Sequence, residues 1–372
     1  MRFRFAVALL LAVPCLAQVP APERAALAAL YRSAGGAEWR DRSGWLGRPG
    51  TECQWQGVVC DAGGSVVELR LSSNGLTGGV PPELAELTHL RVLDLRSNSL
   101  TGPIPAELGR AGRLEVLDLA YNGLTGEIPR GLGRLGLLRA LSLEHNALTG
   151  VPPGLGRLAN LVALDLSFNP IEELPDDLGL LARLRLLRLR DGRLPEIPAA
   201  VFALSSLETL DLSGNPMAGA GLSEEIGGLD RLTRLACAGC GLTGPLPVGL
   251  GSLSQLQELD LGGNAFDSLP AGIADLTALR VLRLGGSRLE GDLPDLSRLT
   301  ALEALDLSGN PFTPGPVPDW QGLRRLRELS LRATGRSGEI PDWLPELERL
   351  AWLDLAENAF EAGPVPAFFA DM

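Results

Sequence analysis

Residues 90–105 read Leu-Arg-Val-Leu-Asp-Leu-Arg-Ser-Asn-Ser-Leu-Thr-Gly-Pro-Ile-Pro, and the fold follows from this stretch. Its first part fits the pattern Leu-x-x-Leu-x-Leu-x-x-Asn-x-Leu, which returns along the chain in steps of 23 to 25 residues. The repeats start at Val66, Leu90, Leu114, Leu138, Leu161, Leu184, Leu207, Leu232, Leu256, Leu279, Leu302, Leu326 and Leu350. A period of this length predicts small units that each supply one short strand and stack into one elongated domain.

Within each unit the side chains of the strand alternate between two faces. Leu93 and Leu95 should point into the core, whereas Asp94 and Arg96 should point to the concave face of the stack. The ninth position is usually asparagine, because a buried amide there can satisfy backbone groups freed where the chain leaves the strand. This predicted structural ladder comprises Asn74, Asn98, Asn122, Asn146, Asn169, Asn215, Asn264, Asn310 and Asn358. The exceptions are Gly192, Cys240, Ser287 and Thr334.

Many units continue as Leu-Thr-Gly-x-x-Pro, as in residues 100–105 and 124–129. This pattern resembles the plant-type subfamily of leucine-rich repeats, found in receptor-kinase ectodomains and secreted polygalacturonase-inhibiting proteins. Other units, such as residues 174–178 and 269–273, resemble the shorter repeats of bacterial and Ras-associated proteins. The resemblance covers residues 66–372 and implies an α/β solenoid: a right-handed superhelix of thirteen units with a parallel sheet on its concave face.

Residues 18–65 precede the repeats and contain a different pattern. Residues 22–33 carry Leu27, Leu30 and Tyr31 at helical spacing, and the Trp-x-Gly-Val-x-Cys motif follows at residues 55–60. This segment resembles the N-terminal cap of plant-type repeat proteins, and a helical cap is expected because a solenoid end exposes unpaired strand and apolar core. The resemblance implies a disulfide between Cys53 and Cys60, worth roughly 2.5 kcal/mol from loop closure in an oxidising compartment.

Residues 1–17 have the features of a secretory signal peptide. The run Met-Arg-Phe-Arg precedes an apolar stretch over residues 5–13 and small residues that end at Ala17. Cleavage after Ala17 is the prediction, and lipid attachment at Cys15 is the alternative, for which Pro14 is a poor fit. The apolar stretch is too short to span a bilayer and no later segment is long enough. We therefore expect a secreted protein, extracellular or periplasmic.

The charge of the chain excludes several classes of function. The net charge is −12, and an acidic protein repels phosphate backbones, so no nucleic-acid partner is expected. All 33 basic residues are arginine, which excludes Schiff-base lysines, the phosphate-loop lysine and the ATP-anchoring lysine of kinases. The missing lysines, the shorter repeats and the lack of an Asn-x-Ser/Thr sequon lead us to expect a bacterial source.

Two short motifs suggest a cofactor or a metal, but the repeat pattern accounts for both. Cys237 and Cys240 have the spacing of a redox pair or half a metal site, yet they fall on a core leucine position and an asparagine position. No second cysteine pair or nearby histidine completes a zinc site. Residues 131–136 match Gly-x-Gly-x-x-Gly, but glycines recur at this place in other units. The sequence therefore predicts neither a metal nor a cofactor.

Catalysis has few candidate residues, because the chain contains two histidines. His89 lies on a turn, and His145 is expected near Ser142, Asp118 and Asp165, which together could be drawn as a nucleophile, a base and a carboxylate. Nothing in the sequence indicates an oxyanion hole or an enclosed pocket. We therefore predict that the protein is not an enzyme.

The concave face contains the predicted ligand-binding residues. Tyr121, His145 and Phe168 are the eighth residues of three successive units, and Arg188 and Arg190 lie in the next unit. Exposed aromatic side chains beside arginine have the composition of an interface hot spot. Later units carry glycine at the eighth position, at Gly214, Gly239, Gly263, Gly286 and Gly309.

Aspartate recurs at the fifth position of the unit, at Asp94, Asp118, Asp165, Asp211, Asp260, Asp306 and Asp354. Arginine interrupts the column at Arg70, Arg188 and Arg283. The simpler interpretation is that aspartate is common in the repeat and that Arg188 pairs with Asp165 and Asp211 on the adjacent strands.

The predicted function is recognition of a protein or peptide on the concave face, as an adhesin, a sensor subunit or an inhibitor. Binding of a carbohydrate or cell-wall polymer is the alternative, but a row of three aromatic residues beside arginine favours protein. A structural envelope protein that associates through an open C-terminal end is a third hypothesis. Three interpretations of the end at Met372 stay open: Phe368 and Phe369 cover the last unit, the end pairs with a partner, or the reading frame is cut short.

Overall fold

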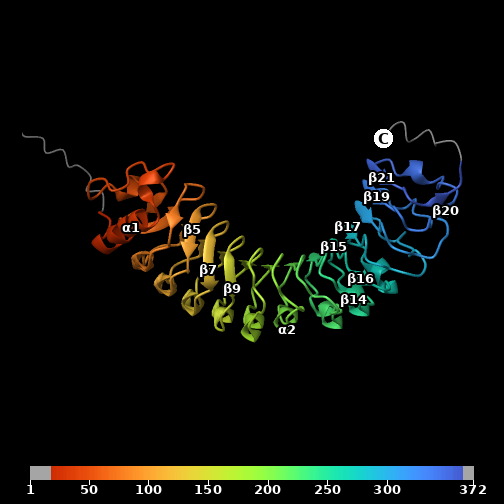
Figure 1. The fold of residues 1–372 in the computed structure, drawn as a ribbon, viewed down its shortest axis with the longest axis horizontal. Helices are drawn as coiled ribbons and strands as arrows, with labels where there is room; N and C mark the ends of the chain where they lie inside the picture. The colour runs from red at the N-terminus through yellow and green to blue at the C-terminus, as the bar shows by residue number, and fades with distance from the viewer. Residues whose placement is uncertain (1–17, 363–372) are drawn as a thin grey trace, which may run out of the picture.

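The structure is a computed structural model that describes residues 18–362. The predicted signal peptide and its alternative at Cys15 lie outside the described residues, as do Phe368 and Phe369. The described chain forms a curved solenoid, with the main sheet on the inner side of the arc and short helical turns on the outer side (Figure 1). The expected α/β solenoid with a parallel sheet is confirmed.

In residues 18–362 the main sheet contains 14 strands, of which the first, β1 (Val58–Cys60), pairs antiparallel with β2. Every other neighbouring pair in this sheet is parallel. The parallel strands are β2 (Val66–Arg70), β4 (Val92–Asp94), β6 (Val116–Asp118), β8 (Ala140–Ser142), β10 (Ala163–Asp165), β11 (Leu186–Arg188), β12 (Thr209–Asp211), β13 (Arg234–Ala236), β15 (Glu258–Asp260), β17 (Val281–Arg283), β18 (Ala304–Asp306), β19 (Glu328–Ser330) and β21 (Trp352–Asp354).

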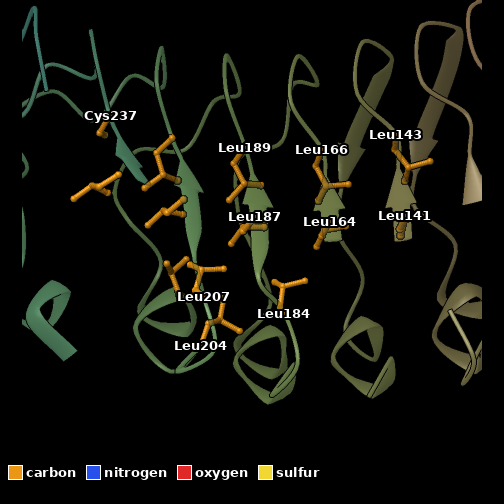
Figure 2. Packing of buried hydrophobic residues seen from close by; sticks show 14 of the residues in the cluster. Leu141, Leu143, Leu164, Leu166, Leu184, Leu187, Leu189, Leu204, Leu207 and Cys237 are labelled. Atoms are coloured by element: carbon orange, nitrogen blue, oxygen red, sulfur yellow. The ribbon is translucent and has the colours of Figure 1, made fainter. Parts of the chain in front are cut away.

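Each strand pairs with the next in the same register, so equivalent positions of successive units form columns. Asp94 lies opposite Asp118, for example, and Leu93 lies opposite Leu117. Leu93 and Leu95 are fully buried, and Figure 2 shows equivalent leucines of neighbouring units, such as Leu164 and Leu187, side by side on neighbouring strands. Full burial of a leucine contributes roughly 1.5–3 kcal/mol, so the solenoid is stabilised by many equal contributions along its length.

The returning segments on the outer side are short 3₁₀ turns and one short helix, α2 (Ala199–Phe202). Most of them follow a proline in extended conformation, which ends the preceding extended segment. The turns of the repeats are η3 (Pro82–Glu86), η4 (Ala106–Arg110), η5 (Arg130–Arg134), η6 (Leu155–Arg157), η7 (Asp176–Leu180), η8 (Glu224–Gly228), η9 (Val248–Ser252), η10 (Ala271–Asp275) and η11 (Leu344–Glu346).

The Leu-Thr-Gly segments form additional parallel strands that the sequence analysis did not predict. The first four units join β3 (Thr77–Gly78), β5 (Ser99–Gly102), β7 (Gly123–Glu127) and β9 (Ala147–Gly150) into one sheet. Later units form two separate pairs, β14 (Thr243–Gly244) with β16 (Ala265–Phe266) and β20 (Ser337–Gly338) with β22 (Ala359–Phe360).

The ninth-position asparagines each connect two units. In Asn98, Nδ2 donates to the carbonyl oxygens of Leu71 at 2.9 Å and Leu95 at 2.8 Å. Its Oδ1 accepts from the backbone amides of Asn74 and Leu76, both at 3.0 Å. One amide side chain thus satisfies backbone groups of its own unit and of the preceding unit, where they are shielded from water.

The N-terminal segment covers the first strand edge. Its helix α1 (Ala21–Ser33) buries Leu27 and Leu30, and two turns, η1 (Gly36–Glu38) and η2 (Glu52–Gln54), follow it. The predicted disulfide between Cys53 and Cys60 is present, with a Cα–Cα distance of 5.5 Å. Strand β1 then pairs with β2, which leaves the backbone of the first repeat protected.

Candidate ligand-binding site

The structure brings Tyr121, His145 and Phe168 into one face-to-face column, which we name the aromatic stack. The ring centroids of Tyr121 and His145 lie 4.4 Å apart with planes at 22°, and those of His145 and Phe168 lie 3.9 Å apart at 13°. The column forms because the common register places equivalent residues about one strand spacing apart, roughly 4.8 Å. Arg190 extends it, with the guanidinium carbon 5.9 Å from the Phe168 ring centroid.

The backbone of the aromatic stack is left-handed. The φ angles are 54° at Tyr121, 51° at His145 and 55° at Phe168, and five later units have glycine at this position with φ between 63° and 75°. A residue other than glycine costs about 1–2 kcal/mol in this conformation, whereas an aromatic pair contributes about 0.5–1.5 kcal/mol. Stacking therefore does little more than offset the strain. Ser73, Ser97, Asp191, Ala333 and Glu357 have the same left-handed backbone at this position, so the conformation belongs to the repeat and does not by itself mark the stack as a site.

A depression of about 530 Å³ lies on the concave face beside the aromatic stack, over strands β6, β8, β10 and β11. Its floor includes the small residues Ala140, Ser142 and Ala163. Carboxylates, arginines and the ring of Tyr121 line its sides, from Arg96, Asp118, Tyr121, Glu144, Asp165 and Arg188. We name it the acidic depression.

Burial and mutual repulsion perturb the carboxylates of the acidic depression. Burial raises the pKa of Asp118, and the charges of Asp94 and Asp165 raise it further. Burial also raises the pKa of Glu144, again with a contribution from Asp165. In both groups the charged form is disfavoured relative to water.

The two arginines partly compensate this negative charge. Arg188 Nη1 lies 3.4 Å from Asp165 Oδ2, and Arg96 Nη1 lies 3.6 Å from Asp118 Oδ2. The expected second pairing of Arg188, with Asp211, is wrong: within residues 18–362 its ion pair is with Asp165 alone. One guanidinium on the intervening strand turns toward one neighbour, because it cannot reach carboxylates on both sides equally.

The predicted site residues therefore divide into two adjoining groups. Tyr121, His145, Phe168 and Arg190 form one row, and Arg188 lines the acidic depression next to it. The sequence analysis did not identify Glu144, although it named Arg190, which holds the same seventh position in a later unit. The small residues of two neighbouring strands, Ala140 and Ser142 of β8 and Ala163 of β10, were the sequence signal for a hollow at this place.

The aspartate column has a structural role in addition to its charge. Each aspartate Oδ1 accepts the backbone amide two residues further on, as in Asp165 from Ser167 at 3.1 Å and Asp306 from Ser308 at 2.9 Å. This local bond explains why aspartate recurs at the strand ends, whether or not a ligand is near.

The motifs that suggested chemistry have structural explanations. Cys237 and Cys240 are buried, and Cys240 Sγ donates to the Leu212 carbonyl at 3.3 Å, where other units use an asparagine amide. Residues 131–136 lie in and beside the outer turn η5, so this glycine pattern does not join a strand to a long helix. Among the hydrogen bonds of residues 18–362, none connects Ser142 with His145, so the triad that could be drawn from the sequence is not assembled.

Two further observations concern the whole described chain. Across residues 18–362 no histidine, cysteine and carboxylate side chains gather in a group of three or more that could hold a metal ion. The helices of this part of the chain are all too short or too polar to cross a membrane.

Sequence profiles of repeat families match most of the chain. The leucine-rich repeat region profile matches residues 175–363. Two further leucine-rich repeat profiles match residues 112–171 and 136–194, and residues 65–87 and 89–111.

Three solved structures show how widely the fold is shared. The ectodomain of the receptor kinase GASSHO1/SCHENGEN3 from Arabidopsis thaliana, in complex with CASPARIAN STRIP INTEGRITY FACTOR 2, is 34% identical, with a TM-score of 0.66 over 81% of this chain and 39% of that chain. The plant peptide hormone receptor RGFR1, in complex with RGF2, is 28% identical, with a TM-score of 0.70 over 83% and 57%. The leucine-rich-repeat protein LIC12759 of Leptospira interrogans is 30% identical, with a TM-score of 0.67 over 79% of both chains.

The chain spans less than two thirds of either plant receptor chain, but it matches the Leptospira protein over most of its length. The profiles and the structural likeness both indicate a leucine-rich repeat architecture. This chain belongs to the leucine-rich repeat family and resembles the ectodomains of plant receptor kinases.

Proposed function

We propose that this protein is a secreted, non-catalytic recognition module of a bacterium, extracellular or periplasmic, that binds a protein or peptide on its concave face. Residues 1–17 would direct secretion, residues 18–65 would cap the solenoid and residues 66–372 would form the binding repeats. The observation that carries the proposal is the aromatic stack, three stacked rings beside the acidic depression.

The orientation of the rings favours a polypeptide over a glycan. Sugar rings pack against the faces of aromatic rings, but the faces of His145 are occupied by Tyr121 and Phe168. The stack therefore presents mainly ring edges, which carry partial positive charge and suit carbonyl oxygens and apolar side chains. A row of edges with Arg188 and Arg190 beside it is closer to a protein hot spot than to a sugar platform.

The solved relatives support the same class of partner. The two plant receptor structures contain a bound partner, and one of these receptors is described as a peptide hormone receptor. Since a fold by itself does not determine a ligand, this likeness supports the use of the solenoid for recognition, and the site carries the rest of the argument.

The test starts with capture of partners from culture medium and envelope extracts by the mature protein. Each identified partner is then purified and titrated calorimetrically against wild type and Tyr121→Gly/His145→Gly/Phe168→Gly. Glycine is chosen because five later units carry it at this position with a similar φ. We expect the affinity to fall at least about 100-fold, since the variant lacks the hot-spot side chains that a bound partner would bury.

The matched control is Ala333→Gly/Glu357→Gly, which changes the same position, also at positive φ, near the other end of the solenoid. This variant should bind as wild type does. Equal binding by all three proteins would move the site to another face, and retention of polysaccharide in place of a protein would favour the glycan alternative.

A further inference from the structure

The acidic depression has more negative than positive charge on its walls. Asp118 and Asp165 are paired with Arg96 and Arg188, but Glu144 has no ion pair within residues 18–362. The buried Asp94 adds a carboxylate behind Arg96, at 3.8 Å. Since Arg96 is shared between two carboxylates, an additional positive charge would be attracted here.

The depression is also large enough to admit a side chain. Its floor is made of Ala140, Ser142 and Ala163, whose small side chains leave about 530 Å³ open to the concave face. No large residue of the described chain fills this volume, and Tyr121 of the aromatic stack is one of its lining residues.

One wall is the free end of the aromatic stack. The inner face of Tyr121 meets His145, while the equivalent residue of the preceding unit, Ser97, is small, and Tyr121 remains 46% exposed. In the described chain no guanidinium lies over this ring, in contrast to Phe168, which Arg190 covers. The face of an aromatic ring is negative and attracts cations at roughly 0.5–2 kcal/mol.

We propose that the acidic depression binds a basic side chain, arginine or lysine, of the polypeptide partner, with its cation between the carboxylates of Asp118 and Glu144 and beside the ring of Tyr121. This inference rests on the proposed function and adds the chemical class of the ligand residue. The occupant is a basic peptide because the excess of carboxylates is complementary to a cation, and the net charge of −12 steers such a peptide toward the protein.

The perturbed carboxylates agree with this occupant. Burial and repulsion raise the pKa of Asp118 and of Glu144, so the charged form of each carboxylate is destabilised in the free protein. A bound cation stabilises the charged forms and removes part of that cost. Binding should therefore release protons and weaken as the pH falls through these pKa values. Asp94, Asp165, Arg96, Arg188 and His145 are the other charged or titratable groups that act on these two carboxylates.

The test is selection of random short peptides displayed on phage against three forms of the mature protein. These are wild type, Asp118→Asn/Glu144→Gln and the control Asp260→Asn/Asp306→Asn. Asparagine keeps the oxygen that accepts the Ala120 amide at 3.1 Å, so the first variant changes charge and not the local bond. The control removes two carboxylates from the same strand column outside the depression, which matches the change in net charge.

We expect peptides selected on wild type and on the control to be enriched in arginine or lysine relative to the unselected library. The Asp118→Asn/Glu144→Gln protein should lose that enrichment, and a representative peptide should bind it at least about tenfold more weakly. Selected peptides without a basic excess, or with the same excess on both double variants, would overturn this inference and leave the proposed function standing. Selection of no peptide on any form would contradict both.

Discussion

The solenoid has two parts that differ in the asparagine column and in the concave surface. From Asn74 to Asn169 the ninth position is asparagine in every unit, and the second sheet β3–β5–β7–β9 runs beside it. Beyond Asn169 asparagine alternates with other residues, in the order Gly192, Asn215, Cys240, Asn264, Ser287, Asn310, Thr334 and Asn358. The aromatic stack lies in the first part and the glycine positions lie in the second.

The alternation has a local cause in the residue that follows asparagine. In the first part a backbone amide reaches the asparagine of the next unit, as Leu100 N does to Asn122 Oδ1 at 3.0 Å. Asn169, Asn215 and Asn310 are each followed by proline and by a unit without asparagine. The amides after these prolines fold back onto the carbonyl of their own asparagine, at 2.7, 2.9 and 2.9 Å, from Ile171, Met217 and Phe312.

Such a bond between residues two apart is a γ-turn, and proline suits it because it has no amide of its own to satisfy. This amide then needs no asparagine side chain in the next unit, and Gly192, Cys240 or Thr334 can occupy the ninth position there. The Met217 amide also donates to the backbone carbonyl of Cys240, at 2.8 Å. Asn264 is followed by alanine and strand β16 continues, so Ser287 is outside this explanation. The comparison shows that the residue at the ninth position of a unit depends on the turn formed in the preceding unit.

The largest expected effect contrasts the two parts of the column. Asn169→Leu removes donation to the Leu143 and Leu166 carbonyls at 2.9 and 3.0 Å and leaves the Leu148 amide unpaired, so we expect a loss of about 3–5 kcal/mol. Ser287→Ala removes one bond, to Leu261 O at 3.1 Å, and should cost about 1 kcal/mol. Urea unfolding measures the loss of unfolding free energy for both variants. Equal losses would mean that the asparagine column stabilises the two parts of the solenoid alike.

The next effect separates binding from stability in the aromatic stack. Tyr121→Gly/His145→Gly/Phe168→Gly should lose most ligand affinity while the thermal midpoint changes by a few degrees at most. Glycine relieves the left-handed backbone, which offsets the lost stacking. A calorimetric scan beside the binding titration checks this, and a large fall in the midpoint would mean that the stack is mainly structural.

The converse change introduces an aromatic residue into the glycine positions. At Gly286 φ is 64° and a Cβ atom would have nothing within 4 Å, so Gly286→Tyr should cost about 1–2 kcal/mol from backbone strain alone. The control Gly286→Ala should cost a similar amount, because the strain comes from Cβ. Urea unfolding measures the free energy of unfolding of both variants. A loss for Gly286→Ala without a loss for Gly286→Tyr would contradict this prediction.

The smallest expected effect is the contribution of the acidic depression to the pH dependence of stability. The pKa of Asp118 and that of Glu144 are raised above 3.8 and 4.5 in the folded protein, so in this window the native state binds more protons than the unfolded state. Wild type should therefore gain stability relative to Asp118→Asn/Glu144→Gln as the pH falls toward those values. Thermal midpoints of both proteins across this range measure the difference, and a relative loss would mean that the carboxylates are stabilised by charge pairing.

The leucine period determined the stack of similar units and the adjacency of equivalent positions, because a constant register turns the repeat into columns. The resemblance to leucine-rich repeats implied the parallel concave sheet. The cap motif likewise was enough to predict the bond between Cys53 and Cys60, which the structure contains. The adjacency of Tyr121, His145 and Phe168 follows from the same arithmetic, since each is the eighth residue of its unit.

Tertiary structure alone decided how those columns are used. The repeat does not specify that the rings stack face to face, that Arg190 covers Phe168, or that Arg188 turns to Asp165 and away from Asp211. These outcomes depend on side-chain rotamers, strand curvature and the size of neighbours on three strands at once. The acidic depression, with Glu144 on its wall, arises for the same reason: a hollow is a property of several units packed together, and a one-dimensional pattern describes only one.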